Sequence, residues 1–161
     1  MSDQDPTLDR IHHGFRLYCR GERAEGRQIL LEMWEQLDAK KDVFHRCVAA
    51  HYLADTEDDP QAELEWDRKA LAEAESIGED RSHPSVAAVR AFYPSLHLNL
   101  ADDYRRLGDF ERARHHVDQG SGYLEHLGVD AYGQTVRSAL LRVDAQISER
   151  DSGPPVIFDF D

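Results

Sequence analysis

The chain has 161 residues, of which 32% are charged, and its formal net charge is −13. Duplex nucleic acid and anionic membrane surfaces both require a basic patch on the protein, so this acidic excess excludes them as expected partners. No apolar run approaches the roughly 20 residues that cross a bilayer, and the acidic N-terminus lacks the apolar core of a secretory signal. The two cysteines, Cys19 and Cys47, match no metal-ligand spacing and are expected to be reduced thiols. We therefore expect a cytoplasmic protein with one folded domain over residues 1–150 and a tail over residues 151–161.

The first helical hairpin is predicted over residues 5–34. Asp5-Pro6 is a typical helix start, because an aspartate side chain accepts hydrogen bonds from the first N–H groups and proline is favoured in the first turn. Gly21 predicts the turn between the helices, since glycine is the residue that most easily reverses the chain. The second helix carries apolar side chains at helical spacing, namely Ile29, Leu30, Met33 and Trp34.

A second, weaker hairpin is predicted over residues 47–71. Its first helix leads into an acidic turn, and Asp59-Pro60 then repeats the helix-start signal. Residues 55–80 hold eleven carboxylates and only two basic side chains, which accounts for most of the charge imbalance. Basic or neutral partners are therefore the ones that this surface favours.

The third hairpin is predicted over residues 96–120. Residues 85–93 add a helical stretch before it that leads into Pro94. Because proline inside a helix costs about 3 kcal/mol, we expect a kink or a break there. Beyond Asp151, the sequence Ser-Gly-Pro-Pro cannot continue a helix, so the tail is expected to be extended or disordered. Between these segments an amphipathic helix is predicted, with apolar side chains at Tyr132, Val136, Leu140, Val143 and Ile147.

The segment 96–114 resembles one tetratricopeptide repeat. Its first helix ends in the pattern Leu-Ala-x-x-Tyr, its turn is Leu-Gly-Asp-Phe, and its second helix opens around the small residue Ala113. The aligned turns at Gly21, Asp58 and Gly108 are 37 and 50 residues apart, against about 34 in the family. The resemblance implies an all-α fold, a right-handed superhelix of about three helical hairpins plus a C-terminal capping helix. It also implies an adaptor that binds a peptide or partner protein in a concave groove, with no catalysis and no cofactor.

In the family, the first helices of the hairpins line the concave groove. Asn99, Asp102 and Arg106 share one stripe of the third first helix, and some members of the family clamp a peptide's terminal carboxylate with Asn, Lys and Arg at such positions. The paired lysines are missing here, and the alternative is a surface stripe in which Asp102 pairs with Arg106 within the helix. The predicted peptide-binding residues are Phe15, Tyr18, Tyr52, Asn99, Asp102, Arg105 and Arg106.

The second hairpin places ionisable residues where the family has small or aromatic ones. His51 occupies a position that is usually Gly or Ala, and Glu63 and Asp67 occupy the facing positions. One interpretation is a structural network, because buried ionisable groups need mutual hydrogen bonds. Another is that the alignment slips by one residue, which brings Ala62 and Trp66 to the packed positions. A third is that His51, Asp55 and His97 converge as a small-molecule or divalent-metal site, even that of an enzyme. The residues of this possible polar or metal-binding cluster are His51, Asp55, Glu63, Asp67 and His97.

The tail over residues 154–161 is an apolar peptide interspersed with carboxylates. It could fold back onto Phe15 and Tyr52, or into a neighbouring molecule, with its carboxylates near Arg105 or Arg106. The alternative is a mobile end, as chain termini usually are. A structural role, with self-association as a homodimer, is the remaining class of function, and its apolar contacts would be Trp34, Trp66 and Phe158.

Overall fold

A computed structural model describes residues 4–77, 80 and 82–154, and these residues fold into helices with no β-strand among them. The all-α class predicted from the sequence is confirmed. No helix in this described part of the chain is both long and apolar enough to cross a lipid bilayer. The helices are α1 (Pro6–Cys19), α2 (Arg23–Gln36), α3 (Val43–Asp55), α4 (Pro60–Glu75), α5 (Val86–Arg106), α6 (Phe110–Gly122), the short 3-10 helix η1 (Leu124–His126) and α7 (Ala131–Ser148).

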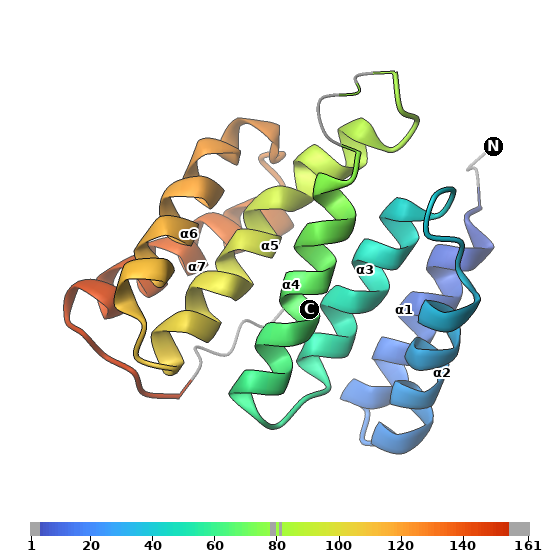
Figure 1. Ribbon diagram of the computed structural model, residues 1–161, viewed down its shortest axis with the longest axis horizontal. Coiled ribbons are helices and arrows are strands. Elements are labelled where there is room, and N and C mark those ends of the chain that lie inside the picture. The colour runs from blue at the N-terminus through green and yellow to red at the C-terminus, as the bar shows by residue number, and fades with distance from the viewer. Residues whose placement is uncertain (1–3, 78–79, 81, 155–161) are drawn as a thin grey trace. The chain divides into compact units, whose positions relative to one another are not determined.

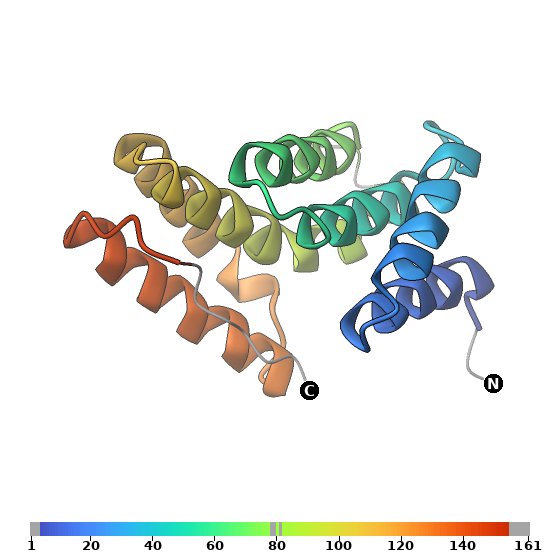
Figure 2. The same cartoon turned by 90° about the horizontal axis from the view of Figure 1, so that it is seen from below.

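The chain divides into two compact units, Met1–Asp80 and Arg81–Asp161. Figure 1 shows the helices of the first unit as two hairpins, α1/α2 and α3/α4. The second unit contains the α5/α6 hairpin, and α7 packs against both of its helices, as Figure 2 shows. The domain boundary expected after residue 150 stays a prediction. On α7, the expected apolar face is buried at Val136, Leu140, Val143 and Ile147, whereas Tyr132 is exposed.

The Asp-Pro pairs begin the helices that the sequence assigned to them. Asp5 Oδ1 accepts a hydrogen bond of 2.9 Å from an N–H of the first turn, and Pro6 is the first residue of α1. Asp59 Oδ2 accepts one of 3.2 Å in the same way, and Pro60 begins α4. Both predicted helix starts are confirmed.

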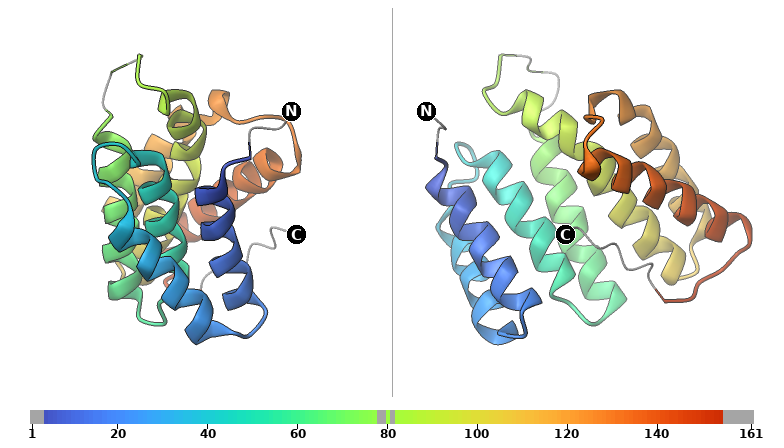
Figure 3. Two further views of the ribbon diagram at one scale, coloured as in Figure 1. Left: turned by 90° about the vertical axis from the view of Figure 1, so that its right-hand side faces the viewer. Right: turned by 180° about the vertical axis from the view of Figure 1, so that it is seen from behind.

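Helices α1 and α2 approach each other closely at two glycines. In the right-hand view of Figure 3, α1 lies directly over α2. A Cβ added to Gly26 would overlap the main-chain oxygen of Gly14 and lie 2.5 Å from the main-chain nitrogen of Tyr18. In the third hairpin, the corresponding small residues Ala101 and Ala113 are fully buried. Small side chains therefore occur where the paired helices meet.

We expect the Gly26→Ala substitution to lower the free energy of unfolding by about 1–3 kcal/mol, because the added Cβ fits only if the main chain of α1 moves. Urea unfolding followed by far-ultraviolet circular dichroism measures the loss. The control is Gly122→Ala, where a Cβ meets no atom within 4 Å and alanine should be neutral or stabilising by up to about 1 kcal/mol. Equal stabilities of the two variants would contradict the close approach.

Helix α5 continues through Pro94, so the break expected there does not occur. Pro94 is buried, and α6 lies close to this turn: a Cβ on Gly120 would be 3.5 Å from the Pro94 oxygen and 3.1 Å from the Cβ of His97. Packing against α6 offsets the hydrogen bond that proline cannot make, because tertiary contacts routinely override local helix propensity.

The two tryptophans form a packed pair in the first unit. The rings of Trp34 on α2 and Trp66 on α4 are perpendicular, with centroids 5.4 Å apart. The Arg46 guanidinium lies 3.9 Å from the Trp34 ring centroid, and the Lys69 ammonium lies 4.1 Å from that of Trp66. Both indoles are half-buried by these contacts. Self-association through them stays a prediction, and Phe158 lies outside the described residues.

Candidate functional site

Three aromatic side chains of the first unit meet between α1 and α3. The rings of Phe15 and Tyr52 stack with centroids 4.3 Å apart and planes 7° apart. His12 contacts the Tyr52 ring edge-on, with centroids 5.8 Å apart. All three side chains are half-buried. We call Phe15, Tyr52 and His12 the aromatic patch, and it brings together two of the predicted peptide-binding residues.

Tyr18, another predicted peptide-binding residue, lies one turn after Phe15, near the end of α1. Its hydroxyl donates a hydrogen bond of 3.4 Å to the main-chain oxygen of Thr56, directly after α3. The Arg23 guanidinium lies 4.9 Å from the centroid of its ring. Tyr18 therefore fastens the end of α1 to the end of α3.

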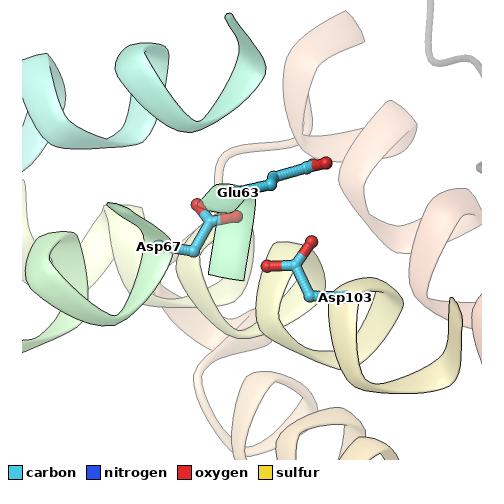
Figure 4. Close-up of side chains that lie close together, drawn as sticks. All are labelled: Glu63, Asp67 and Asp103. Carbon is cyan, nitrogen blue, oxygen red and sulfur yellow. The ribbon is translucent and has the colours of Figure 1, made fainter. Parts of the chain in front are cut away.

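The polar residues predicted in the second hairpin lie on α3 and α4. Asp67 is only 1% exposed, and its Oδ1 lies 3.9 Å from Nδ1 of His51. Burial lowers the pKa of His51 to about 4, so the imidazole is neutral at pH 7. Figure 4 shows Glu63 and Asp67 one turn apart on α4. Asp67 is buried, and Trp66 packs on Trp34 of α2. The burial of Asp67 agrees with the alignment that places Glu63 and Asp67, and not Ala62 and Trp66, at the positions facing α3.

The metal alternative joins residues of both units. His51 and Asp55 belong to the first unit, where Asp55 is exposed at the end of α3, and His97 belongs to the second. The convergence of these three side chains stays a prediction. Asp103, also labelled in Figure 4, accepts a hydrogen bond of 2.9 Å at Oδ1 from Arg106 Nη2 within α5.

Arg105 on α5 is a fully buried arginine, with 0% of its surface exposed. Its Nε and Nη2 donate to Asp102 Oδ1 at 2.9 and 2.7 Å. Its Nη1 donates to the main-chain oxygens of Asp151 and Gly153 at 2.8 and 3.0 Å, and Nη2 donates to that of Pro154 at 3.3 Å. A guanidinium has five N–H donors, and all five find an acceptor here. We call Asp102 and Arg105 the carbonyl clamp.

Arg106 extends along α5 and binds the Asp102 carboxylate of the carbonyl clamp. Its Nε donates to Asp102 Oδ2 at 3.1 Å, which is the intrahelical pair that the sequence offered as an alternative. Both arginines therefore bind the Asp102 carboxylate, and such charge-assisted bonds fix the orientation of Arg105. Asn99, the remaining predicted residue of this helix, is half-buried one turn earlier on α5.

The residues that follow α7 meet Arg105 through their main chain. Main-chain oxygens of Asp151, Gly153 and Pro154 accept its hydrogen bonds. The carboxylates of the predicted tail, Asp159 and Asp161, lie outside the described residues, so their placement near Arg105 or Arg106 stays a prediction. The carboxylate of Asp151 accepts a hydrogen bond of 2.8 Å from the N–H of Gly153. Residues 155–161 lie outside the described part of the chain.

A stack of aromatic rings lies between α5 and α6. His97 Nδ1 and His116 Nδ1 are 3.0 Å apart, so one nitrogen carries a proton that the other accepts. Tyr104 stacks on His116 with centroids 5.5 Å apart, and the Tyr123 ring lies parallel to His97 at 6.2 Å. Burial above all, and then the neighbouring charges of His116 and His115, lowers the pKa of His97 to about 4.

Two parts of these arrangements were not predicted from the sequence. The main-chain oxygens of residues 151–154 leave no sequence signal, because every residue has one. The pairing of His97 with His116 is the other part. Part of the ring stack around His97 could have been predicted, because Tyr93 and His97 are four residues apart and share a face of α5, where their ring centroids are 5.9 Å apart.

No family model, curated protein or solved structure matches this chain. The possible chemistry therefore follows from the geometry. A guanidinium donates hydrogen bonds and keeps its proton at neutral pH, so the carbonyl clamp is suited to binding acceptor groups rather than to transferring protons. Three of the acceptors that it binds are main-chain oxygens.

Proposed function

We propose that this protein is an interaction module that binds a non-helical peptide segment of a partner protein, with the carbonyl clamp as the principal contact. One observation carries the proposal: Arg105 directs three of its five N–H donors at main-chain oxygens of residues 151–154. That segment is not helical, so the clamp already holds the backbone of a peptide segment that has its main-chain oxygens free of a helix. Any peptide carries the same oxygens.

The aromatic patch supports the proposal as a second surface, in the first unit. Stacked rings such as those of Phe15 and Tyr52 bind apolar and proline-containing segments. The net charge of −13 favours basic or neutral partners. We further propose the right-handed superhelix that the tetratricopeptide resemblance implies, a cytoplasmic location, and no catalytic reaction or cofactor.

The test removes the segment that occupies the clamp. Truncation after Arg150 leaves every helix complete, because α7 ends at Ser148. The truncated protein is expected to bind members of a library of short synthetic peptides in fluorescence anisotropy. Arg105→Lys in the truncated protein should weaken that binding at least about tenfold, because an ammonium cannot span Asp102 and three carbonyls as the planar guanidinium does.

The control is Arg112→Lys in the same truncated protein. Arg112 is 69% exposed in its ion pair with Asp109, and the substitution should leave peptide binding unchanged. Circular dichroism checks that each variant is folded. Failure of every peptide to bind, or binding that ignores Arg105→Lys, would overturn the proposed function.

A further inference from the structure

Residues 151–154 are held in a shape that fits the carbonyl clamp. Asp151 Oδ1 accepts a hydrogen bond of 2.8 Å from the N–H of Gly153, which closes a tight turn. This bond, followed by one from Gln146, holds the pKa of Asp151 below its ordinary value. With the turn closed, the main-chain oxygens of Asp151, Gly153 and Pro154 all reach Arg105.

Two residue types in this segment are suited to that shape. A Cβ on Gly153 would lie 2.9 Å from Asp151 Oδ1, so a larger residue fits only if the Asp151 side chain that closes the turn shifts. Pro154 has no N–H to place beside a guanidinium that can only donate, and it favours an extended conformation of the preceding residue. Ser152, between them, is exposed. The sequence Asp-x-Gly-Pro therefore encodes the conformation that the clamp holds.

We propose that the carbonyl clamp recognises Asp-x-Gly-Pro segments, and that residues 151–154 are an internal copy of the ligand, which such a segment of a partner protein displaces. This inference rests on the proposed function and names the class of ligand for the same site. The exposed second position can vary, whereas the aspartate, glycine and proline define the motif.

The burial of Arg105 explains why a displacing segment must place its main-chain oxygens as the internal segment does. The internal segment supplies three of the five acceptors of a guanidinium that is 0% exposed, and a buried donor without an acceptor is strongly unfavourable. An arriving segment must therefore supply the same three oxygens. The internal copy competes at high effective concentration because it follows α7 directly, with the Asp151 N–H bonded to the Gln146 oxygen at 2.8 Å.

The experiment uses the full-length chain and a labelled synthetic peptide, Asp-Ser-Gly-Pro-Pro-Val, with blocked ends. Asp151→Ala removes the acceptor that closes the internal turn, so this variant should bind the peptide at least about tenfold more tightly than the original chain in fluorescence anisotropy. Ser152→Ala is the matched control, since this exposed neighbour should leave the affinity unchanged. Two altered peptides, with Gly replaced by Val or Asp replaced by Ala, should bind Asp151→Ala at least about tenfold more weakly than the original peptide.

Two results would overturn the inference. The first is equal affinity of the original chain and the Asp151→Ala variant for the peptide. The second is equal binding of the peptide in which Val replaces Gly. If library peptides bind the truncated protein through Arg105 while Asp-Ser-Gly-Pro-Pro-Val does not, this inference fails and the proposed function stands. If the Arg105→Lys substitution weakens the binding of no peptide, both this inference and the proposed function fail.

Discussion

Replacing Arg105 by alanine is expected to lower the free energy of unfolding by about 3 kcal/mol. Asp102 is 7% exposed and would keep its bond from Arg106 but lose both hydrogen bonds from Arg105. A buried charge that loses its partner is strongly destabilising, and the remaining bond from Arg106 places the effect at the lower end of the range of about 3–5 kcal/mol. Urea unfolding followed by circular dichroism measures the change.

Arg112→Ala is the control for this substitution. Arg112 pairs with Asp109 through a hydrogen bond of 2.7 Å, but the arginine side chain is 69% exposed. Exposed ion pairs contribute little, so the free energy of unfolding should change by less than about 1 kcal/mol. Similar losses for Arg105→Ala and Arg112→Ala would contradict the assignment of Arg105 as a buried, fully hydrogen-bonded side chain.

The protein is expected to lose stability between pH 6.5 and pH 4 through His97. The pKa of His97 is about 4 in the folded chain, against an ordinary value of 6.5. Below pH 6.5 the unfolded chain therefore binds a proton that the folded chain excludes, so acid favours unfolding. The contribution of His97 is fully present above pH 6.5 and is lost as the pH falls to about 4. Since one pKa unit corresponds to about 1.36 kcal/mol, the loss is about 3 kcal/mol.

Denaturant unfolding at a series of pH values tests this expectation with His97→Phe. Phenylalanine keeps a ring against Tyr123 but cannot titrate, so the variant should lose about 3 kcal/mol less than the original chain between pH 7 and pH 4. The control is His13→Gln, which replaces an exposed histidine on α1 and should leave the pH dependence of the original chain unchanged. Parallel curves for His97→Phe and the original chain would show that His97 does not cause the acid sensitivity.

The sequence by itself determined where two of the helices begin and where the chain reverses at two glycines. Asp5-Pro6 and Asp59-Pro60 begin α1 and α4 because a cap acts on N–H groups within one turn of the chain. Gly21 and Gly108 mark reversals, with φ of +100° and +80°, because glycine adopts positive φ without strain. These effects are local, so a short window of sequence contains all of their physics.

Only the tertiary structure decided which side chains form the candidate site. Arg105 and Arg106 are adjacent and look alike in the sequence, yet a step of one residue turns a side chain by about 100° on a helix, so Arg105 faces the tail while Arg106 runs along α5. The oxygens that Arg105 binds are 46 to 49 residues away, and they are main-chain atoms that every sequence contains. Similarly, Pro94 remains inside α5 because α6 packs beside it, which no local propensity could indicate.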